Sequence, residues 1–163
     1  RYWRVLSQAD LLLKTFAARF YGKVSPVHLF WHSFDLAVTL FNGKAAPPMP
    51  DADAVTQDAY AAEVVSFGWW PGDANTRAPA FYSYTAPEPK NLRKQPLKPG
   101  AAMWIEQGSG SLAVLPYDAI REEDDPRALV LEFLQSAYDA GTTAAGWDRD
   151  AFAYPHAPKA YGE

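Results

Sequence analysis

Hydrophobic residues recur at three- and four-residue steps through residues 1–21. This spacing predicts an amphipathic helix over that range, with most basic side chains on the opposite face. Gly22 follows at once and is expected to end the helix, because glycine readily adopts the left-handed conformation of a helix C-cap. The apolar stripe that we expect to face the core consists of Trp3, Leu6, Ala9, Leu12, Leu13, Phe16, Ala17 and Phe20.

The densest apolar and aromatic segment lies next, between residues 24 and 41. Residues 27–31 are apolar on both faces of an extended chain, which predicts a central strand or a strand covered by a helix. Residues 34–41 alternate between apolar and polar, which predicts a strand with one apolar face. We expect the two strands to pair antiparallel through a turn at residues 32–34. Asn42-Gly43 then predicts a second tight turn.

Four further strands are predicted from alternation or from short runs of apolar residues. They cover residues 63–69, 81–85, 102–106 and 112–115. Before them, a short helix ending near Ala62 is predicted, with Asp51 or Asp53 as its N-cap. Because short turns connect the strands, we expect mainly antiparallel pairing.

The last predicted helix begins at Asp125-Pro126, an N-cap acid followed by proline at the first helical position, and ends at Gly141. The order of elements predicts an α+β fold: a mainly antiparallel sheet of about five or six strands, with the N-terminal and C-terminal helices packed on it. We interpret residues 1–163 as a single domain, in which residues 148–163 form a surface tail.

Composition narrows the class of protein. The chain has 163 residues, 48% of them hydrophobic, which suits one globular domain with its own core. The net charge of −4 and the lack of a basic block argue against nucleic-acid binding. The sequence contains no run of about 18 apolar residues, so it predicts no membrane span. The absence of cysteine and of a visible signal peptide suits a cytoplasmic protein.

No cofactor is predicted. The glycine-rich loop at residues 107–111 lacks the lysine of a phosphate-binding loop and does not open a helix, so it does not indicate a nucleotide site. No Gly-x-Ser-x-Gly motif occurs, so a serine hydrolase is unsupported. The sequence leaves the oligomeric state open.

The first candidate site is a metal site at His28 and His32, which are four residues apart and would share one face of a strand. Two histidines need a further ligand, and Asp35, Glu63 or Glu88 would have to supply it. The alternative is one core histidine bonded to the backbone or to a carboxylate, with one surface histidine at the turn.

The second candidate is a polar cluster of His28, Asp35 and Glu63 among aromatic residues. A histidine beside a carboxylate in apolar surroundings is a competent acid or base. This predicts an enzyme that uses His28 as general base with Glu63 or Asp35, with or without a metal ion. The alternative is a structural histidine–carboxylate pair, or acids exposed at strand ends.

The third candidate is an aromatic face. Flat apolar walls with hydroxyl groups and an acid suit a small organic or cationic ligand. Core packing is the alternative for most of these residues, and Trp70, beside Pro71-Gly72, is the one that core packing explains least. The face consists of Trp31, Trp69, Trp70, Tyr82 and Tyr84, with Glu88 near them in the sequence.

Several short motifs occur together in the chain: Ser25-Pro26-Val27-His28-Leu29-Phe30-Trp31, Ser33-Phe34-Asp35-Leu36-Ala37-Val38-Thr39, Gly68-Trp69-Trp70-Pro71-Gly72 and Pro87-Glu88-Pro89. With them the chain resembles an uncharacterised bacterial family, one of the domains of unknown function, as far as Trp147. The resemblance implies no activity. It implies a further region before Arg1, so that this chain would be the C-terminal part of a longer protein.

The resemblance also bears on the candidate sites. His28, Asp35, Glu63 and Glu88 fall on positions that the family pattern includes, whereas glycine is usual where this chain has His32, which weakens the two-histidine metal site. We therefore expect a small-ligand-binding or partner-binding domain with an aromatic, histidine and carboxylate face. Its partner would be a small molecule or the region before Arg1. The enzyme with His28 as base remains the alternative.

Overall fold

The computed structural model describes residues 2–153, apart from residues 49, 52, 75, 76 and 109. The described residues form one antiparallel seven-stranded sheet in the order β1-β3-β4-β5-β7-β6, with β2 pairing with β3 beside this path. The predicted α+β class is confirmed. The strands are β1 (Lys23–Val24), β2 (His28–Phe30), β3 (Asp35–Ala45), β4 (Ala62–Trp70), β5 (Ala80–Ala86), β6 (Met103–Gln107) and β7 (Gly110–Pro116).

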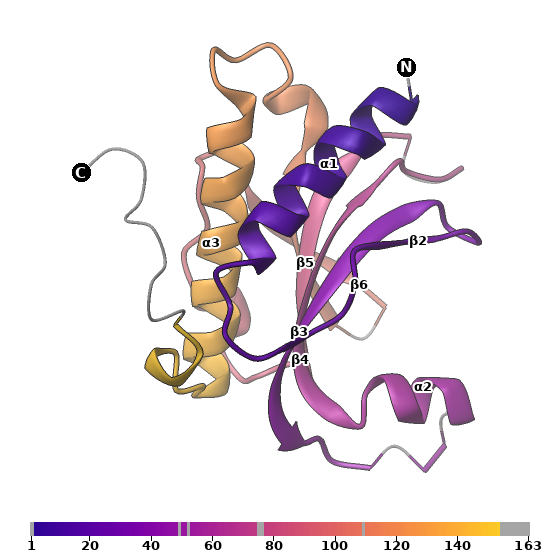
Figure 1. Ribbon diagram of the computed structural model, residues 1–163, viewed down its shortest axis with the longest axis vertical. Coiled ribbons are helices and arrows are strands. Elements are labelled where there is room, and N and C mark those ends of the chain that lie inside the picture. The colour runs from indigo at the N-terminus through magenta and orange to yellow at the C-terminus, as the bar shows by residue number, and fades with distance from the viewer. Residues whose placement is uncertain (1, 49, 52, 75–76, 109, 154–163) are drawn as a thin grey trace.

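Helices α1 (Tyr2–Ala17) and α3 (Pro126–Ala145) cover one face of the sheet, whereas the short helix α2 (Ala54–Ala59) lies at one end (Figure 1). Short 3-10 turns complete the described elements: η1 (Leu92–Lys94), η2 (Tyr117–Ala119) and η3 (Asp150–Phe152). The sheet and its two long helices therefore make two layers, and the core lies between them.

The core is built from the apolar stripes of both helices and from alternate residues of the central strands. Leu13 of α1, Phe133 of α3 and Phe67 of β4 are among its fully buried side chains. Burial of this apolar area is the main favourable term in folding. The residues of β3 and β4 that face the helices follow the period-2 pattern of the sequence: Leu36, Val38 and Leu40 on β3, and Val65, Phe67 and Trp69 on β4.

Helix α1 ends earlier than predicted. It stops at Ala17, and Gly22 lies beyond it in the chain. A Cβ atom on Gly22 would lie 2.5 Å from the ring of Phe20, so the glycine permits close packing there and does not cap the helix. Trp3, predicted on the buried stripe, is 76% exposed, and Leu6 is the first buried residue of α1.

Helix α3 runs further than predicted. It passes through Gly141, and Gly146 caps it with a φ of 67° in the left-handed region. Gly141 lies against β5, where an added Cβ would collide with the hydroxyl of Thr85. The glycine at 141 therefore permits a close approach of helix and sheet, and the glycine one turn later ends the helix.

The aromatic segment of residues 27–31 is not a central or covered strand, and that prediction was wrong. Strand β2 is three residues long, all exposed, and it pairs with the first residues of β3. Asn42-Gly43 is not a turn between strands either. It lies inside β3, where Gly43 has a φ of 79° and the register with β4 shifts between Phe41 and Ala45. The pair therefore forms a bulge that bends the strand.

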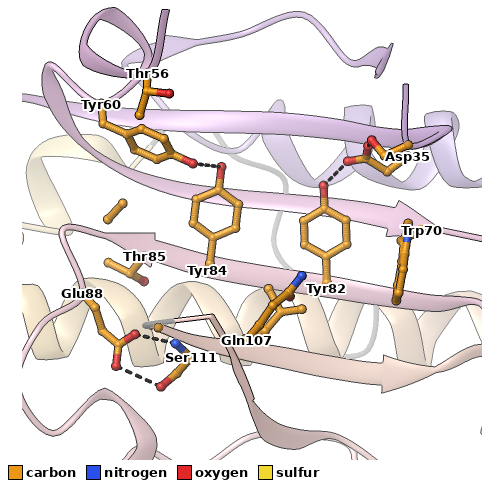
Figure 2. A pocket seen from close by; sticks show the side chains of 14 residues that line it. Asp35, Thr56, Tyr60, Trp70, Tyr82, Tyr84, Thr85, Glu88, Gln107 and Ser111 are labelled. Atoms are coloured by element: carbon orange, nitrogen blue, oxygen red, sulfur yellow. Dashed lines mark hydrogen bonds between the residues drawn. The ribbon is translucent and has the colours of Figure 1, made fainter. Parts of the chain in front are cut away.

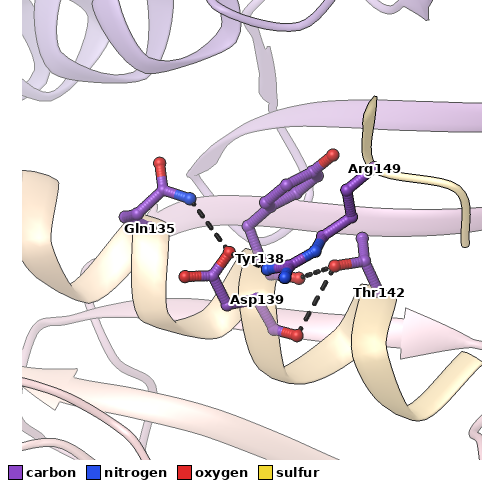
Figure 3. Close-up of polar contacts among 5 residues, drawn as sticks. All are labelled: Gln135, Tyr138, Asp139, Thr142 and Arg149. Atoms are coloured by element: carbon purple, nitrogen blue, oxygen red, sulfur yellow. Dashed lines mark hydrogen bonds and ion pairs between the residues drawn. The ribbon is translucent and has the colours of Figure 1, made fainter. Parts of the chain in front are cut away.

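The segment after α3 folds back on the helices. Arg149 forms an ion pair of 2.7 Å with Asp139 of α3 (Figure 3). The rings of Phe20 and Phe152 stack with centroids 4.9 Å apart. Most of the predicted surface tail, residues 154–163, lies outside the described residues.

A substitution at the N-cap of α3 tests the prediction that Asp125 caps this helix. The side chain of Asp125 accepts a hydrogen bond of 3.0 Å from the backbone N–H of Ala128. We expect Asp125→Ala to lower the free energy of unfolding by about 1 kcal/mol, because this N–H loses its partner. Urea unfolding measures the change, with the neighbouring exposed Asp124→Ala as control. Equal unfolding midpoints for the two variants would contradict the capping role.

Candidate functional site

The face of the sheet that α1 and α3 leave open carries its own set of side chains. Ala37, Gly68 and Tyr82 lie directly opposite one another on β3, β4 and β5. Thr39, Ser66 and Tyr84 form a second row on the same face, two residues further along each strand. Because paired residues of an antiparallel sheet point to the same face, these rows stand opposite the core residues.

Tyr82 lies across the open face and does not stand upright on it. A Cβ atom on Gly68 would lie 2.5 Å from the Tyr82 hydroxyl and 2.6 Å from the carbonyl oxygen of Leu36. The ring thus passes over Gly68, and its hydroxyl donates a hydrogen bond of 2.5 Å to Oδ2 of Asp35 on β3 (Figure 2). The other oxygen of Asp35 accepts from the hydroxyl of Ser33.

Tyr84 is held by a residue that follows α2. The hydroxyl of Tyr60 donates to the Tyr84 hydroxyl over 3.3 Å (Figure 2). Burial raises the pKa of Tyr84, and burial together with the bond to the Asp35 carboxylate raises the pKa of Tyr82. Both phenols therefore remain neutral far into the alkaline range and act as hydroxyl groups, never as anions, at physiological pH.

A second carboxylate is fixed beside β7. Glu88 accepts a hydrogen bond of 2.5 Å from the backbone N–H of Ser111 and one of 2.9 Å from its hydroxyl. Each of its oxygens thus has one protein donor. An ionised carboxylate offers about four acceptor positions, so part of its capacity remains available to a ligand.

These side chains surround a cavity of about 570 Å³ on the open face (Figure 2). Among the described residues that line it there is no Lys, Arg or His. Its two acids and neutral hydroxyl groups make it an acceptor-rich, negatively charged space with aromatic walls. The lining consists of Ser33, Asp35, Thr56, Tyr60, Trp70, Tyr82, Tyr84, Thr85, Ala86, Glu88, Gln107, Gly110, Ser111 and Leu112.

Five residues singled out in the sequence meet at this cavity although they come from three strands and a loop. They are Asp35, Trp70, Tyr82, Tyr84 and Glu88. Trp70 separates the cavity from a second, more open hollow that is lined in part by His32 and Pro71. Trp69, by contrast, points to the helices and is buried in the core.

His28 and His32 lie on the β2–β3 hairpin, outside the 570 Å³ cavity. Nδ1 of His28 lies 2.9 Å from the carbonyl oxygen of Pro26, so Nδ1 carries the proton and donates. Phe30 contacts the rings of both His28 and His32. Trp31 at the hairpin turn is 79% exposed. In the described part of the chain, no three side chains of His, Asp or Glu are grouped to hold a metal ion.

Glu63 lies at the opposite end of β4 from the row that His28 joins. His28 pairs with Ala37, which pairs with Gly68, five residues along β4 from Glu63. The carboxylate of Glu63 accepts from Asn42 over 2.5 Å and from the Trp147 indole over 3.1 Å. The structure therefore does not bring Glu63 to His28, and Glu63 ties β3 to the end of α3.

Sequence reasoning missed several residues of the cavity. Tyr60 follows a helix that no local pattern directs toward β5, and Ser111 meets Glu88 because β5 pairs with β7 and not with β6. Gly68 belongs to a sequence motif, yet only the strand register shows that it lies beneath the ring of Tyr82. Ser33 had a usable signal, since it lies two residues before Asp35 in a predicted turn.

The fold and the cavity define an α+β domain with one sheet face covered by helices and one open aromatic face. Residues 1–154 match DUF5996, a family of unknown function, and the chain belongs to this family. No curated protein and no solved structure matches the chain. Within the described residues, no helix has both the length and the apolar character needed to cross a membrane.

The floor of the cavity can be tested by filling the space at Gly68. We expect Gly68→Ala to lower the free energy of unfolding by about 1–3 kcal/mol, because the new methyl group overlaps Tyr82 and a backbone carbonyl. Gly100→Ala is the control, since nothing lies within 4 Å of a Cβ atom there. Chemical denaturation measures both variants, and equal stability of the two would contradict the close packing of Tyr82 on Gly68.

The raised pKa of Tyr82 predicts an alkaline loss of stability. In the unfolded chain Tyr82 ionises near its ordinary pKa of 10.0, whereas the folded state keeps it protonated. The unfolded state therefore releases protons first, and the free energy of unfolding falls as the pH rises above about 10. In Tyr82→Phe this fall should be smaller than in the wild type, measured by urea unfolding at about pH 8 and 10.5. Tyr21→Phe, a substitution outside the cavity, is the control. If Tyr21→Phe and Tyr82→Phe lost the same free energy of unfolding between these two pH values, the raised pKa of Tyr82 would not be the cause.

Proposed function

We propose that this domain binds a small organic cation in the cavity of its open sheet face. The observation that carries the proposal is the composition of the cavity lining. It combines two carboxylates, Asp35 and Glu88, with aromatic walls, and the described lining residues include no cationic side chain. Carboxylates form charge-assisted hydrogen bonds with ammonium or guanidinium groups. The faces of Trp70 and the tyrosines attract the same groups through their π systems.

Electrostatics favour a cation over an anion or a neutral ligand. Asp35 is partly buried and Glu88 is exposed, and none of the ion pairs found among the described residues involves either of them. A partly desolvated anion without a counter-charge is unfavourable, so a bound cation lowers the free energy of the site. Hydrogen bonds from Ser33, Tyr82 and Ser111 already hold the two acids in place. Binding thus needs little ordering of these side chains.

Partner binding is a second candidate, favoured by a different surface. The β2–β3 hairpin exposes four apolar side chains, and Trp3 lies exposed at the start of α1. Grouped exposed aromatic residues are typical of interaction surfaces. The four are Leu29, Phe30, Trp31 and Phe34.

A ligand screen tests the cation site. We expect alkylamines, agmatine and spermidine to raise the melting temperature of the wild type, and butyrate and glucose to leave it unchanged, because the cavity offers acceptors and negative charge. Trp70→Ala should weaken amine binding in calorimetry about tenfold, by loss of an aromatic wall. Trp31→Ala, which removes an exposed indole on the hairpin, is the matched control and should bind as the wild type does.

Two results would overturn this proposal. One is the absence of any thermal shift or binding heat with the amines. The other is an equal loss of amine affinity in Trp31→Ala and Trp70→Ala. The first result would leave the hairpin surface as the better-supported functional region.

A further inference from the structure

The geometry points to a ligand with two separated positive charges, a linear diamine or polyamine, as the occupant of this cavity. This inference rests on the proposed cation site and specifies its ligand class. It follows from the positions of Asp35 and Glu88, which do not form one acidic cluster. Asp35 lies at the Trp70 end of the cavity, and Glu88 lies at the Ser111 end (Figure 2).

The register of the sheet separates the two acids. Leu36, next to Asp35, is connected to Leu115 of β7 by directly paired residues of β4 and β5. Three strand spacings therefore lie between them, about 14 Å. Ser111, which holds Glu88, is four residues further along β7, about 14 Å more in the perpendicular direction. The backbone next to Asp35 and the backbone at Ser111 are thus about 20 Å apart. One ammonium group cannot contact both carboxylates, whereas an extended amine can.

Each end offers a separate ammonium site. Asp35 receives donors from Ser33 and Tyr82, and Glu88 receives two donors from Ser111. Each carboxylate thus keeps about two acceptor positions for a ligand. No Lys or Arg of the described chain is ion-paired with either acid.

The wall between the two ends suits the chain of such a ligand. The rings of Tyr82 and Tyr84 and the side chain of Leu112 offer apolar contact to methylene groups. The tyrosine hydroxyl oxygens are neutral and can accept from internal N–H groups. Two charges on one chain also bind cooperatively, because the second ammonium group meets its carboxylate at high effective concentration.

Calorimetry with a series of straight-chain diamines, from 1,4-diaminobutane to 1,12-diaminododecane, tests the inference. In the wild type we expect affinity to peak at one of the longer lengths. There the diamine should bind about 10-fold to 100-fold more tightly than the monoamine of equal length, because a second charge-assisted hydrogen bond forms. Asp35→Asn and Glu88→Gln should each abolish this advantage while monoamine binding persists at the remaining acid.

A matched control separates the site from general attraction to an acidic protein. The double variant Asp124→Asn, Glu123→Gln removes two negative charges from exposed positions, one more than either single variant, and should keep the diamine advantage. Melting temperatures verify that each variant is folded. Should Asp35→Asn not fold, Glu88→Gln and the dependence on chain length still decide the question.

The outcomes distinguish the two proposals. Equal affinity for monoamines and diamines at every length would overturn the inference and leave the cation site standing, as would a diamine advantage that survives Glu88→Gln. Loss of the advantage in the Asp124→Asn, Glu123→Gln control would overturn the inference too. Absence of binding by every amine would overturn the cation site itself.

Discussion

The hydrogen bond from Tyr82 to Asp35, made across Gly68, organises the open face of the sheet. The helices cover one face of the sheet, yet Ala37 and Ser66 on the other face are only 4% and 2% exposed. Tyrosine rings lie over this part of the sheet where other folds would place a second helical layer. Gly68 provides the space for this arrangement, and the Asp35 carboxylate fixes the far end of the ring.

This layer of hydrogen-bonded tyrosines is less closely packed at its edges than the core is. It covers the sheet but leaves room at its margins, where Trp70, Tyr60 and the strand ends enclose a cavity. Asp35, which holds the ring of Tyr82, and Glu88, which ties the segment after β5 to β7, also line that cavity. The same residues thus stabilise the open face and give it negative charge, which links the fold to the proposed choice of ligand.

The sequence predicted those features that depend on local periodicity. Alternation predicted a strand over residues 81–85, and in β5 Tyr82 and Tyr84 lie on one face and Phe81 on the other, because successive strand residues point in opposite directions. Asp125 was predicted as a cap because capping is a contact within one turn. The aromatic run of residues 27–31 was misjudged, since the same composition suits a core strand and an exposed hairpin, and the difference depends on what packs against it.

Long-range pairing explains the remaining failures. His28 and Glu63 both looked like partners for an acid or a base, but the register of β3 and β4 places them far apart. Glu88 and Ser111 become partners because β5 skips β6 and pairs with β7. Gly141 and Gly146 look equivalent as helix ends in sequence, and the approach of α3 to β5 distinguishes them.

The most direct measurement is an NMR titration of the protein, labelled with ¹³C at its tyrosine rings, with 1,10-diaminodecane. Tyr→Phe variants assign the signals. If the open face is the binding site, the resonances of Tyr82 and Tyr84 shift in a saturable manner while that of Tyr21, which lies just beyond α1, stays in place. Unchanged signals of Tyr82 and Tyr84 at saturating amine would contradict a cation site on this face.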